Sequence, residues 1–467
     1  MTDTKIVLWR WVGLQCSVLV ALAGVVIARG FIPFGDFGLA ALAIGDVFSV
    51  RTPTTGMPST AWWTVPGSDL RHPGPLHFQL LAPVYLATGR SPWGLVFSSA
   101  IFAAAMLIAM LVLAWRIAGP LGVRLVGFSS MIWLLPSMTM VAPWNPVATV
   151  LGTGLALVSA WGVLTRQQWV WPWLVFAFSL TIQSHLGAPI VMAVIAAYVL
   201  FAAIRDARKH GNPWTFTEIL VAMLVGLVCW AAPLWGVISA PRNNLTELMA
   251  WVSAGRDNSG ASNNIGIVAY VLLALVFAIV VVVVLTRKTL YSYEGKTAVS
   301  LRRLTDLYLA AIAGVIVTLV VAGFGTAQFL FYATPIFIFP FVTAGFVGSF
   351  RRGRSASEAR VPRWLVALVV IGPMSFWMYF YPESWLAAAR YSDHVQLSTE
   401  KVLELEGTRD RPVVVSYPGY RWNPVAPAIA AELAANGIDV RIPNREEPIR
   451  SDPLWWRETP VEGPHLR

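Results

Sequence analysis

Long apolar runs separated by short polar loops make up most of the chain. A run of about 20 apolar residues can cross the hydrocarbon core of a bilayer, which is roughly 30 Å thick. By this criterion we expect about eleven membrane-spanning helices, at approximately 7–28, 92–115, 122–141, 146–165, 169–184, 186–204, 217–238, 265–286, 305–323, 327–349 and 363–381. Residues 76–89 are also apolar, but this segment is too short to span upright and Pro83 interrupts it. It predicts an interfacial or re-entrant helix.

The first loop, residues 30–90, differs from the others because it concentrates ionisable and aromatic residues. Apolar residues recur there at intervals of three and four, at Phe37, Ala40, Ala41, Ile44, Val47 and Phe48. This spacing predicts an amphipathic helix that lies along the lipid headgroups. Prolines and glycines then predict turns up to the run Arg71-His72-Pro73-Gly74-Pro75.

The long apolar runs end before Pro382. Residues 412–417 and 438–442 have the pattern of short strands, and 424–436 has that of a helix between them, with a further helix over 399–406. We therefore expect a transmembrane domain over 1–382 and a small β-α-β unit within 383–467. The last residues hold five prolines from Pro443 onward and are expected to be loose.

Composition supports an α-helical polytopic membrane protein. The 467 residues are 57% hydrophobic and only 12% charged, whereas a soluble protein carries about 25% charged residues. The mean hydropathy is +0.64. The N-terminus resembles a signal peptide, but its apolar run ends without a cleavage motif, which favours a retained anchor.

The basic residues indicate the orientation. With the N-terminus in the cytoplasm, the loops on that side hold 18 Lys and Arg and the loops on the other side hold 6. The first loop, residues 239–264 and the C-terminal tail are then extracytoplasmic. Because the net charge of +10 follows the membrane in this way, it does not indicate a nucleic-acid partner. We expect a multi-pass protein of the plasma membrane.

No cofactor is indicated by the sequence. The two cysteines, Cys16 and Cys229, fall in predicted spans, so we expect no disulfide between them. No His, Cys or Asp cluster has metal-site spacing, no glycine-rich loop suits a nucleotide, and no Ser-His-Asp pattern stands out. Without a nucleotide motif, a primary pump is excluded.

Two carboxylates are candidate catalytic groups. Asp36 follows the first span closely, and a carboxylate at a low-dielectric boundary can act as a general base. Alternatively, Asp36 is an ordinary helix cap. Asp46 is either a second acid or part of the polar face of the amphipathic helix.

The candidate substrate-binding residues are Arg71, His72, Trp144, Asn145, Gln183, His185 and Arg256. Arg71 and His72 precede a rigid turn, where a guanidinium suits either a phosphate or lipid headgroups. Trp144 lies in an outside turn and suits either the membrane interface or a sugar ring. Gln183 and His185 lie at the outer end of a span, where they bond to neighbouring helices or line a cavity.

These motifs resemble those of the GT-C superfamily of membrane glycosyltransferases, which includes protein O-mannosyltransferases, aminoarabinose transferases and actinobacterial arabinofuranosyltransferases. The matching segments are Gly35-Asp36, the loop with Thr52-Pro53 and Gly56, and the run from Arg71 to Leu81 followed by Thr88-Gly89. Pro143-Trp144-Asn145-Pro146 and the run from Gln183 to Gly187 are similar to an actinobacterial subgroup that also ends in a small β-α-β tail.

The resemblance implies inverting transfer of a sugar from a polyprenyl-phosphate donor to a cell-envelope glycan, lipid or protein acceptor outside the membrane. Asp36 would take the acceptor proton, and Arg71, with Arg256 or His72, would neutralise the leaving phosphate. Many relatives have two adjacent acids at this position, whereas Phe37 follows Asp36 here. The base role therefore falls to Asp36 alone, and a divalent metal is not indicated.

Two other functions compete with this one. A lipid or glycan transporter or flippase would carry charged or broken helices near the bilayer midplane. Here the middles of the predicted spans are nearly free of ionisable residues and the polar groups gather on one side, which favours chemistry at the surface. A catalytically inactive membrane protein of envelope assembly is the third possibility.

Overall fold

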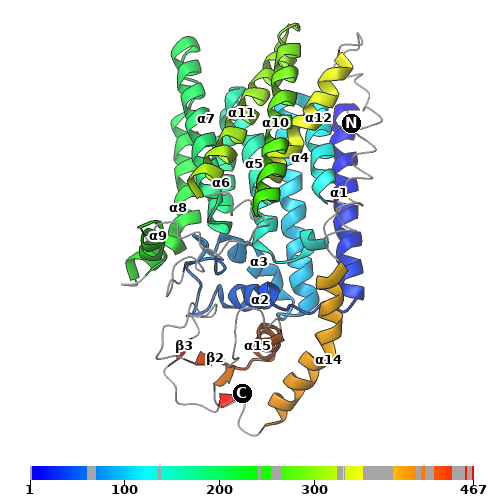
Figure 1. Ribbon diagram of the computed structural model, residues 1–467, viewed down its shortest axis with the longest axis vertical. Coiled ribbons are helices and arrows are strands. Elements are labelled where there is room, and N and C mark those ends of the chain that lie inside the picture. The colour runs from blue at the N-terminus through cyan, green and yellow to red at the C-terminus, as the bar shows by residue number, and fades with distance from the viewer. Residues whose placement is uncertain are drawn as a thin grey trace.

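A computed structural model of the chain describes residues 3–59, 70–134, 138–239, 243–253, 265–322, 330, 332–350, 382–405, 412–415, 425–443, 458–459 and 465–466. Long helices form a bundle, and a small α/β unit lies at one end of it (Figure 1). The bundle contains α1 (Asp3–Ala28), α4 (Pro92–Leu134), α5 (Asn145–Leu164), α6 (Trp171–Ser184), α7 (Ala188–His210), α8 (Phe216–Ser239), α10 (Ile265–Leu290), α11 (Lys296–Ala322) and α12 (Thr334–Phe350).

Shorter elements complete the bundle and form the unit at its end. Near the bundle lie α2 (Asp36–Asp46), α3 (Leu76–Ala87), α9 (Asn244–Ser253) and the 3-10 turns η2 (Met138–Val141) and η3 (Gln168–Val170). The C-terminal unit contains α14 (Pro382–Glu404), β1 (Val413–Val415), α15 (Val425–Ala435), β2 (Val440–Pro443), β3 (Glu458–Thr459) and β4 (His465–Leu466).

Ten of the eleven expected spans overlap described helices, and the eleventh, 363–381, lies outside the described residues. Within the described part of the chain, six helices are long and apolar enough to cross a membrane: α1, α4, α5, α7, α8 and α11. The total of eleven spans remains a prediction. The span expected at 92–115 and most of the one expected at 122–141 lie in α4, whose two segments meet at Ala118 and Gly119. The second of these spans extends past the end of α4 into η2. Gly119 has a φ of 58°, which favours glycine, and Pro120 begins the second segment.

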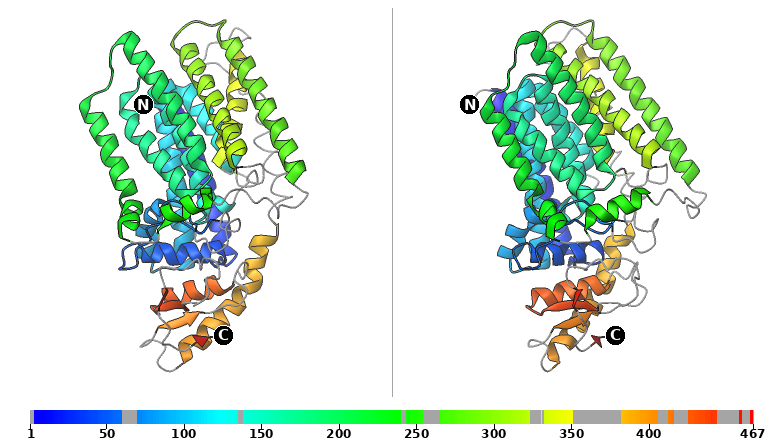
Figure 2. Two further views of the ribbon diagram at one scale, coloured as in Figure 1. Left: turned by 60° about the vertical axis from the view of Figure 1, so that its left-hand side comes forward. Right: turned by 90° about the vertical axis from the view of Figure 1, so that its left-hand side faces the viewer.

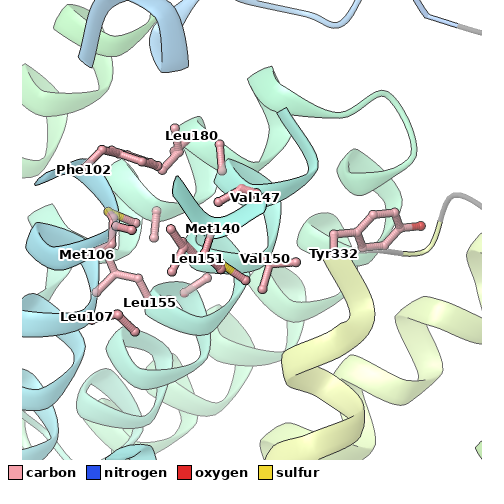
Figure 3. Close-up of a cluster of buried hydrophobic side chains, with 14 of the residues drawn as sticks. Phe102, Met106, Leu107, Met140, Val147, Val150, Leu151, Leu155, Leu180 and Tyr332 are labelled. Carbon is pink, nitrogen blue, oxygen red and sulfur yellow. The ribbon is translucent and has the colours of Figure 1, made fainter. Parts of the chain in front are cut away.

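The core of the bundle is built around α5. Every residue of α5 from Pro146 to Leu164 is buried, as expected for a helix that is apolar on all sides. Figure 3 shows Leu151 and Leu155 of α5 in the same cluster as Met106 of α4 and Leu180 of α6. The first residue of α5 is therefore held in place by a rigid apolar environment.

Residues 37–48 do not present the apolar face to lipid that their spacing predicted, because protein covers the helix. All residues of α2 from Gly38 to Asp46 are buried, because α3 packs on one side of the helix and α15 on another (Figures 1 and 2). The helix contains Leu39, Leu42 and several alanines besides the predicted apolar face, so it is apolar on nearly all sides. A helix of this composition is stable when protein covers it.

The C-terminal unit has a parallel four-stranded sheet in the order β3-β2-β1-β4. β1 and α15 lie within the segments expected to form a β-α-β unit, and β2 overlaps the expected second strand. Two differences concern its ends. The helix expected at 399–406 belongs to the much longer α14, and β3 and β4 lie in the proline-rich segment that was expected to be loose.

Candidate active site

Four segments that are distant in the sequence meet at the end of the bundle that faces the C-terminal unit. They are the start of α2, the loop before α3, the start of α5 and the end of α6 (Figure 1). The contacts between them join most of the residues that the sequence singles out. Arg256 lies outside the described residues.

Asp36 is hydrogen-bonded to the side chain of Trp144. Because the indole Nε1–H of tryptophan is only a donor, the carboxylate of Asp36 is the acceptor. Asp36 is the first residue of α2, and Trp144 directly precedes the buried helix α5. The hydrogen bond therefore joins the start of α2 to the start of a helix that is buried along nearly its whole length.

Protein closely surrounds the carboxyl of Asp36, although the residue as a whole is exposed. Desolvation by this protein raises the pKa of the carboxyl, and the hydrogen bond from Trp144 offsets part of that rise. A raised pKa makes this carboxylate a stronger base than an ordinary aspartate.

Asp36 is not the cap of α2. The N-cap position belongs to Gly35, which has a φ of 52° and makes no side-chain cap hydrogen bond. Asp36 itself lies in the first helical turn, where a negative charge interacts favourably with the helix dipole. The alternative reading of Asp36 as an ordinary capping residue is therefore wrong.

Asp46 cannot act at the same point as Asp36. It is the last residue of α2, ten residues later, and a rise of 1.5 Å per residue places the two about 15 Å apart along the helix. Its residue is only 5% exposed. The structure therefore does not support Asp46 as a second acid in a reaction at Asp36.

Arg71 is held by its backbone in the loop before α3. Its N–H donates to Asn244 Oδ1 at 2.9 Å, and Asn244 Nδ2 donates to its carbonyl at 3.1 Å. Arg71 is only 2% exposed, so its guanidinium lies within the protein and does not reach out to lipid headgroups. The headgroup-anchor alternative for Arg71 is therefore not supported.

His72 and His185 stack on one another, with ring centroids 5.1 Å apart and an interplanar angle of 26°. Each Nδ1 accepts a backbone N–H: His72 from Leu186 at 3.0 Å, and His185 from Gly187 at 3.1 Å. An Nδ1 that accepts a hydrogen bond carries no proton, so both rings are neutral with the proton on Nε2. The ring of Tyr332 packs against His185, with the two ring centroids 5.4 Å apart.

Burial keeps both histidines uncharged. It lowers the pKa of His72 well below its ordinary value, with a further contribution from His185, and it lowers the pKa of His185 to about 4. A role for His72 at the leaving phosphate would therefore be that of a neutral donor rather than a cation. Two neutral Nε2–H groups can instead donate hydrogen bonds to an anion.

Gln183 acts as a brace for the loop. Its Nε2 donates to the carbonyl of Cys229 at 2.7 Å, its Oε1 accepts the N–H of Leu76 at 3.3 Å, and its own carbonyl accepts the N–H of Gly74 at 3.2 Å. The residue is completely buried. Both ends of its amide are used within the protein, so Gln183 positions the loop before α3.

Asn145 connects the two parts of this end of the bundle. Its Nδ2 donates to the carbonyl of Ser184 at 3.0 Å, which ties the start of α5 to the end of α6. Asn145 follows Trp144, the partner of Asp36, and Ser184 precedes His185, the partner of His72. One continuous set of contacts thus connects Asp36 with the histidine stack.

Within the described residues, no group of three or more His, Cys, Asp and Glu is placed to hold a metal ion.

Known proteins resemble this chain in structure but not in sequence. No protein-family model and no curated protein matches it. ArnT from Cupriavidus metallidurans, in a crystal structure with bound undecaprenyl phosphate, is 13% identical over 96% of this chain and 87% of ArnT, with a TM-score of 0.50. The oligosaccharyltransferase AglB from Archaeoglobus fulgidus, in complex with an inhibitory peptide and a dolichol-phosphate, is 13% identical over 91% of this chain and 64% of AglB, with a TM-score of 0.42.

This chain has the same fold as ArnT. The likeness to ArnT confirms the predicted GT-C-like helical membrane architecture. Because sequence identity is so low, the roles of individual residues in this chain depend on its own geometry.

Two residues of this site did not stand out in the sequence. Asn244 follows Asn243, whose Oδ1 accepts the N–H groups of Leu245 and Thr246 at the start of α9, and this capping leaves the Asn244 side chain for Arg71. An asparagine pair before a helix could have indicated it. Tyr332 meets His185 across 147 positions of sequence, and no local pattern predicts that contact.

Proposed function

We propose that this chain is a membrane glycosyltransferase that moves a sugar from a polyprenyl-phosphate donor to an acceptor hydroxyl. The GT-C fold supports the class of enzyme. The undecaprenyl phosphate bound to ArnT supports the class of donor. The basic residues of the sequence support a site on the extracytoplasmic side of the plasma membrane, with the N-terminus in the cytoplasm.

One observation carries the proposal. The carboxylate of Asp36 is joined, through Trp144 and the Asn145–Ser184 hydrogen bond, to two neutral histidines beside a buried arginine. Displacement of a phosphate by a hydroxyl requires a base that accepts the hydroxyl proton and hydrogen-bond donors that stabilise the leaving phosphate.

Asp36 is the general base in this proposal. It takes the proton of the acceptor hydroxyl while the hydroxyl oxygen forms a bond to the anomeric carbon of the donor. The bond between that carbon and the phosphate oxygen breaks on the opposite face, so the configuration inverts. Trp144 holds the carboxylate in place by donating its Nε1–H to it.

The phosphate leaves with the electron pair of the broken bond. The Nε2–H groups of His72 and His185 donate to its oxygens, and the buried charge of Arg71 stabilises the negative charge. Since polyprenyl phosphate is already a good leaving group, no strong acid is needed. Whether the acceptor is a glycan, a lipid or a protein does not change these steps.

Transfer from a labelled donor tests the proposal. Purified protein in lipid vesicles is supplied with polyprenyl-phosphate sugars that carry a radioactive sugar and with extracts of cell-envelope acceptors. We expect label to leave the lipid with the wild-type chain. The Asp36→Asn variant lacks the base, so its rate of sugar transfer should be lower by about a hundredfold or more.

Two matched carboxylate variants complete that experiment. Asp46→Asn removes the acid at the far end of α2, and Asp393→Asn removes an exposed acid on α14. Both should retain most of the rate. Loss of transfer in Asp46→Asn but not in Asp36→Asn would move the base to the other end of the helix.

The competing functions give different outcomes in the same vesicles. A transporter or flippase would move labelled lipid between leaflets without separating the sugar from it. An inactive assembly protein would do neither with any donor. Either result with the wild-type chain contradicts the glycosyltransferase proposal.

A further inference from the structure

The C-terminal unit covers the helix that carries Asp36. In Figures 1 and 2, α15 lies directly along α2, on the side away from the bundle. Most of α15 is buried in this position, from Ala426 to Ala434. Three separate contacts fix how the two helices lie relative to one another.

The first contact is between Gly38 and Pro427. A Cβ on Gly38 would lie 2.7 Å from the carbonyl carbon of Pro427 and 2.9 Å from the carbonyl oxygen of Pro33. Both are backbone atoms, which cannot rotate away as a side chain would. Only glycine allows α15 to come this close, and Gly38 is two residues from Asp36.

The second contact is made by Arg90, which follows α3. One guanidinium nitrogen donates to the carbonyl of Gly45 at 3.2 Å, and another donates to that of Ala434 at 3.5 Å. These carbonyls lie in the last turns of α2 and α15, where a cation also interacts favourably with the helix dipoles. One side chain thus holds the ends of both helices.

The third contact is an ion pair. Arg51 lies beyond the end of α2, and its Nη1 is 2.7 Å from Oδ1 of Asp439, which precedes β2. Both side chains are partly exposed, at 24% and 36%, so the pair contributes little to stability.

We propose that α15 of the C-terminal unit is a positioning element that holds Asp36 at the reacting hydroxyl, with Gly38, Arg90 and Asp439 as positioning residues. This inference rests on the proposed function. The hydrogen bond to Trp144 attaches the start of α2 to the bundle, and α15 packs against the rest of the helix. If α15 moved, α2 would turn about its start and the carboxylate would change direction.

The proposal predicts an effect on the chemical step and not on donor binding. The groups assigned to the donor phosphate lie in the loop before α3 and at the end of α6, and neither segment is part of α2. A displacement of α2 should therefore lower kcat and leave the donor KM nearly unchanged. A displacement near 1 Å can lower a rate by roughly a hundredfold.

Paired variants test this. Gly38→Val inserts a wedge between α2 and α15, and Gly24→Val places the same side chain on α1 where nothing lies within 4 Å. Arg90→Met removes the bridge, Arg90→Lys keeps a cation there, and Arg116→Met removes a cation that lies over Trp169 instead. We expect kcat to fall at least tenfold in Gly38→Val and Arg90→Met, with partial recovery in Arg90→Lys and no change in the controls.

Hydrogen exchange of the α2 amides is measured on the same proteins and needs no activity. We expect faster exchange in α2 for Gly38→Val and Arg90→Met, with exchange in α5 unchanged. Faster exchange with an unchanged kcat, or a KM that rises as much as kcat falls, overturns the positioning role and leaves the glycosyltransferase proposal intact.

A wild-type chain without transfer activity contradicts the proposed function and, with it, the role at the reacting hydroxyl. The exchange data then still decide whether α15 orders α2. If the hydrogen exchange of α2 is unchanged in both Gly38→Val and Arg90→Met, α15 does not position α2, whatever the activity.

Discussion

The imidazole rings of His72 and His185 stack with their centroids 5.1 Å apart, and a backbone N–H donates to the Nδ1 of each ring. The backbone thus selects the same tautomer in both histidines. Burial lowers both pKa values, so the pair stays neutral at physiological pH. This arrangement presents two hydrogen-bond donors without a positive charge.

We expect His72→Asn to raise the donor KM by about tenfold. Asparagine can still accept the N–H of Leu186, but it lacks the Nε2–H, and a hydrogen bond to a charged group contributes about 1.5 to 3 kcal/mol. Initial rates at varied donor concentration measure the effect. His210→Asn, at the far end of α7, is the matched control. An unchanged KM would remove His72 from the donor site.

The neutral pair also predicts how donor binding depends on pH. Because burial lowers the pKa of His185 to about 4 and that of His72 well below its ordinary value, neither ring titrates near neutrality. We expect no histidine titration in the donor KM between about pH 5.5 and 8. A KM that increases as the pH rises through about 6.5 would show that a protonated histidine binds the phosphate.

Trp144→Phe should shift the pH dependence of kcat upward. The hydrogen bond from Trp144 lowers the pKa of Asp36, so its removal raises that pKa further above the ordinary value. The base is active when ionised, and the acid side of the kcat profile should therefore move to higher pH. The rate at saturating donor is measured from acid to neutral pH. A profile that stays in place, or moves to lower pH, would contradict the assignment of Asp36 as the base.

Asp36→Asn should remain folded and be as stable as the wild-type chain or more stable at neutral pH. Burial raises the pKa of Asp36 in the folded state, so ionisation of this group opposes folding. The wild-type chain regains this stability as the pH falls through the raised pKa toward about 3.8, the ordinary value.

Thermal unfolding in detergent at pH 7 and pH 4 measures the stability of Asp36→Asn relative to wild type. The stability advantage of Asp36→Asn should be larger at pH 7 than at pH 4. A variant that is less stable than wild type at pH 7, with the loss disappearing at pH 4, would show that the ionised carboxylate stabilises the fold.

Gln183→Leu should destabilise the protein by about 2 to 3 kcal/mol. It leaves the N–H of Leu76 and the carbonyl of Cys229 without the amide partner in a fully buried place. Denaturant or thermal unfolding measures the loss, and Gln396→Leu on the exposed face of α14 serves as the control. An equally stable Gln183→Leu with a raised donor KM would return Gln183 to the substrate site.

Several features of the fold could be predicted from the sequence. Ten of the predicted spans overlap described helices because membrane-spanning helices need continuous apolar stretches of a fixed length. The pattern of strand, helix and strand at 412–442 is local and also matches the described elements. For α2, however, the spacing of apolar residues was compatible with a lipid surface and with a protein cover, and only its packing against α15 distinguishes the two.

The candidate site was predictable in part. Asp36, Trp144, Asn145 and the two histidines were all singled out by residue type and place, and they belong to one set of contacts. Their individual roles were not predictable. Burial made the histidines neutral, and the partners of Gln183 made it a brace.

The sequence by itself determined that this chain crosses a membrane in helices and gathers its polar chemistry at one end, because hydrophobicity is a property of each local segment. Only the tertiary structure decided which polar groups meet and which of them are charged. The Asp36–Trp144 bond, the histidine stack and the cover of α2 by α15 each join residues more than a hundred positions apart. Proton affinity depends on the burial and partners that such contacts create, so no local pattern of residues contains it.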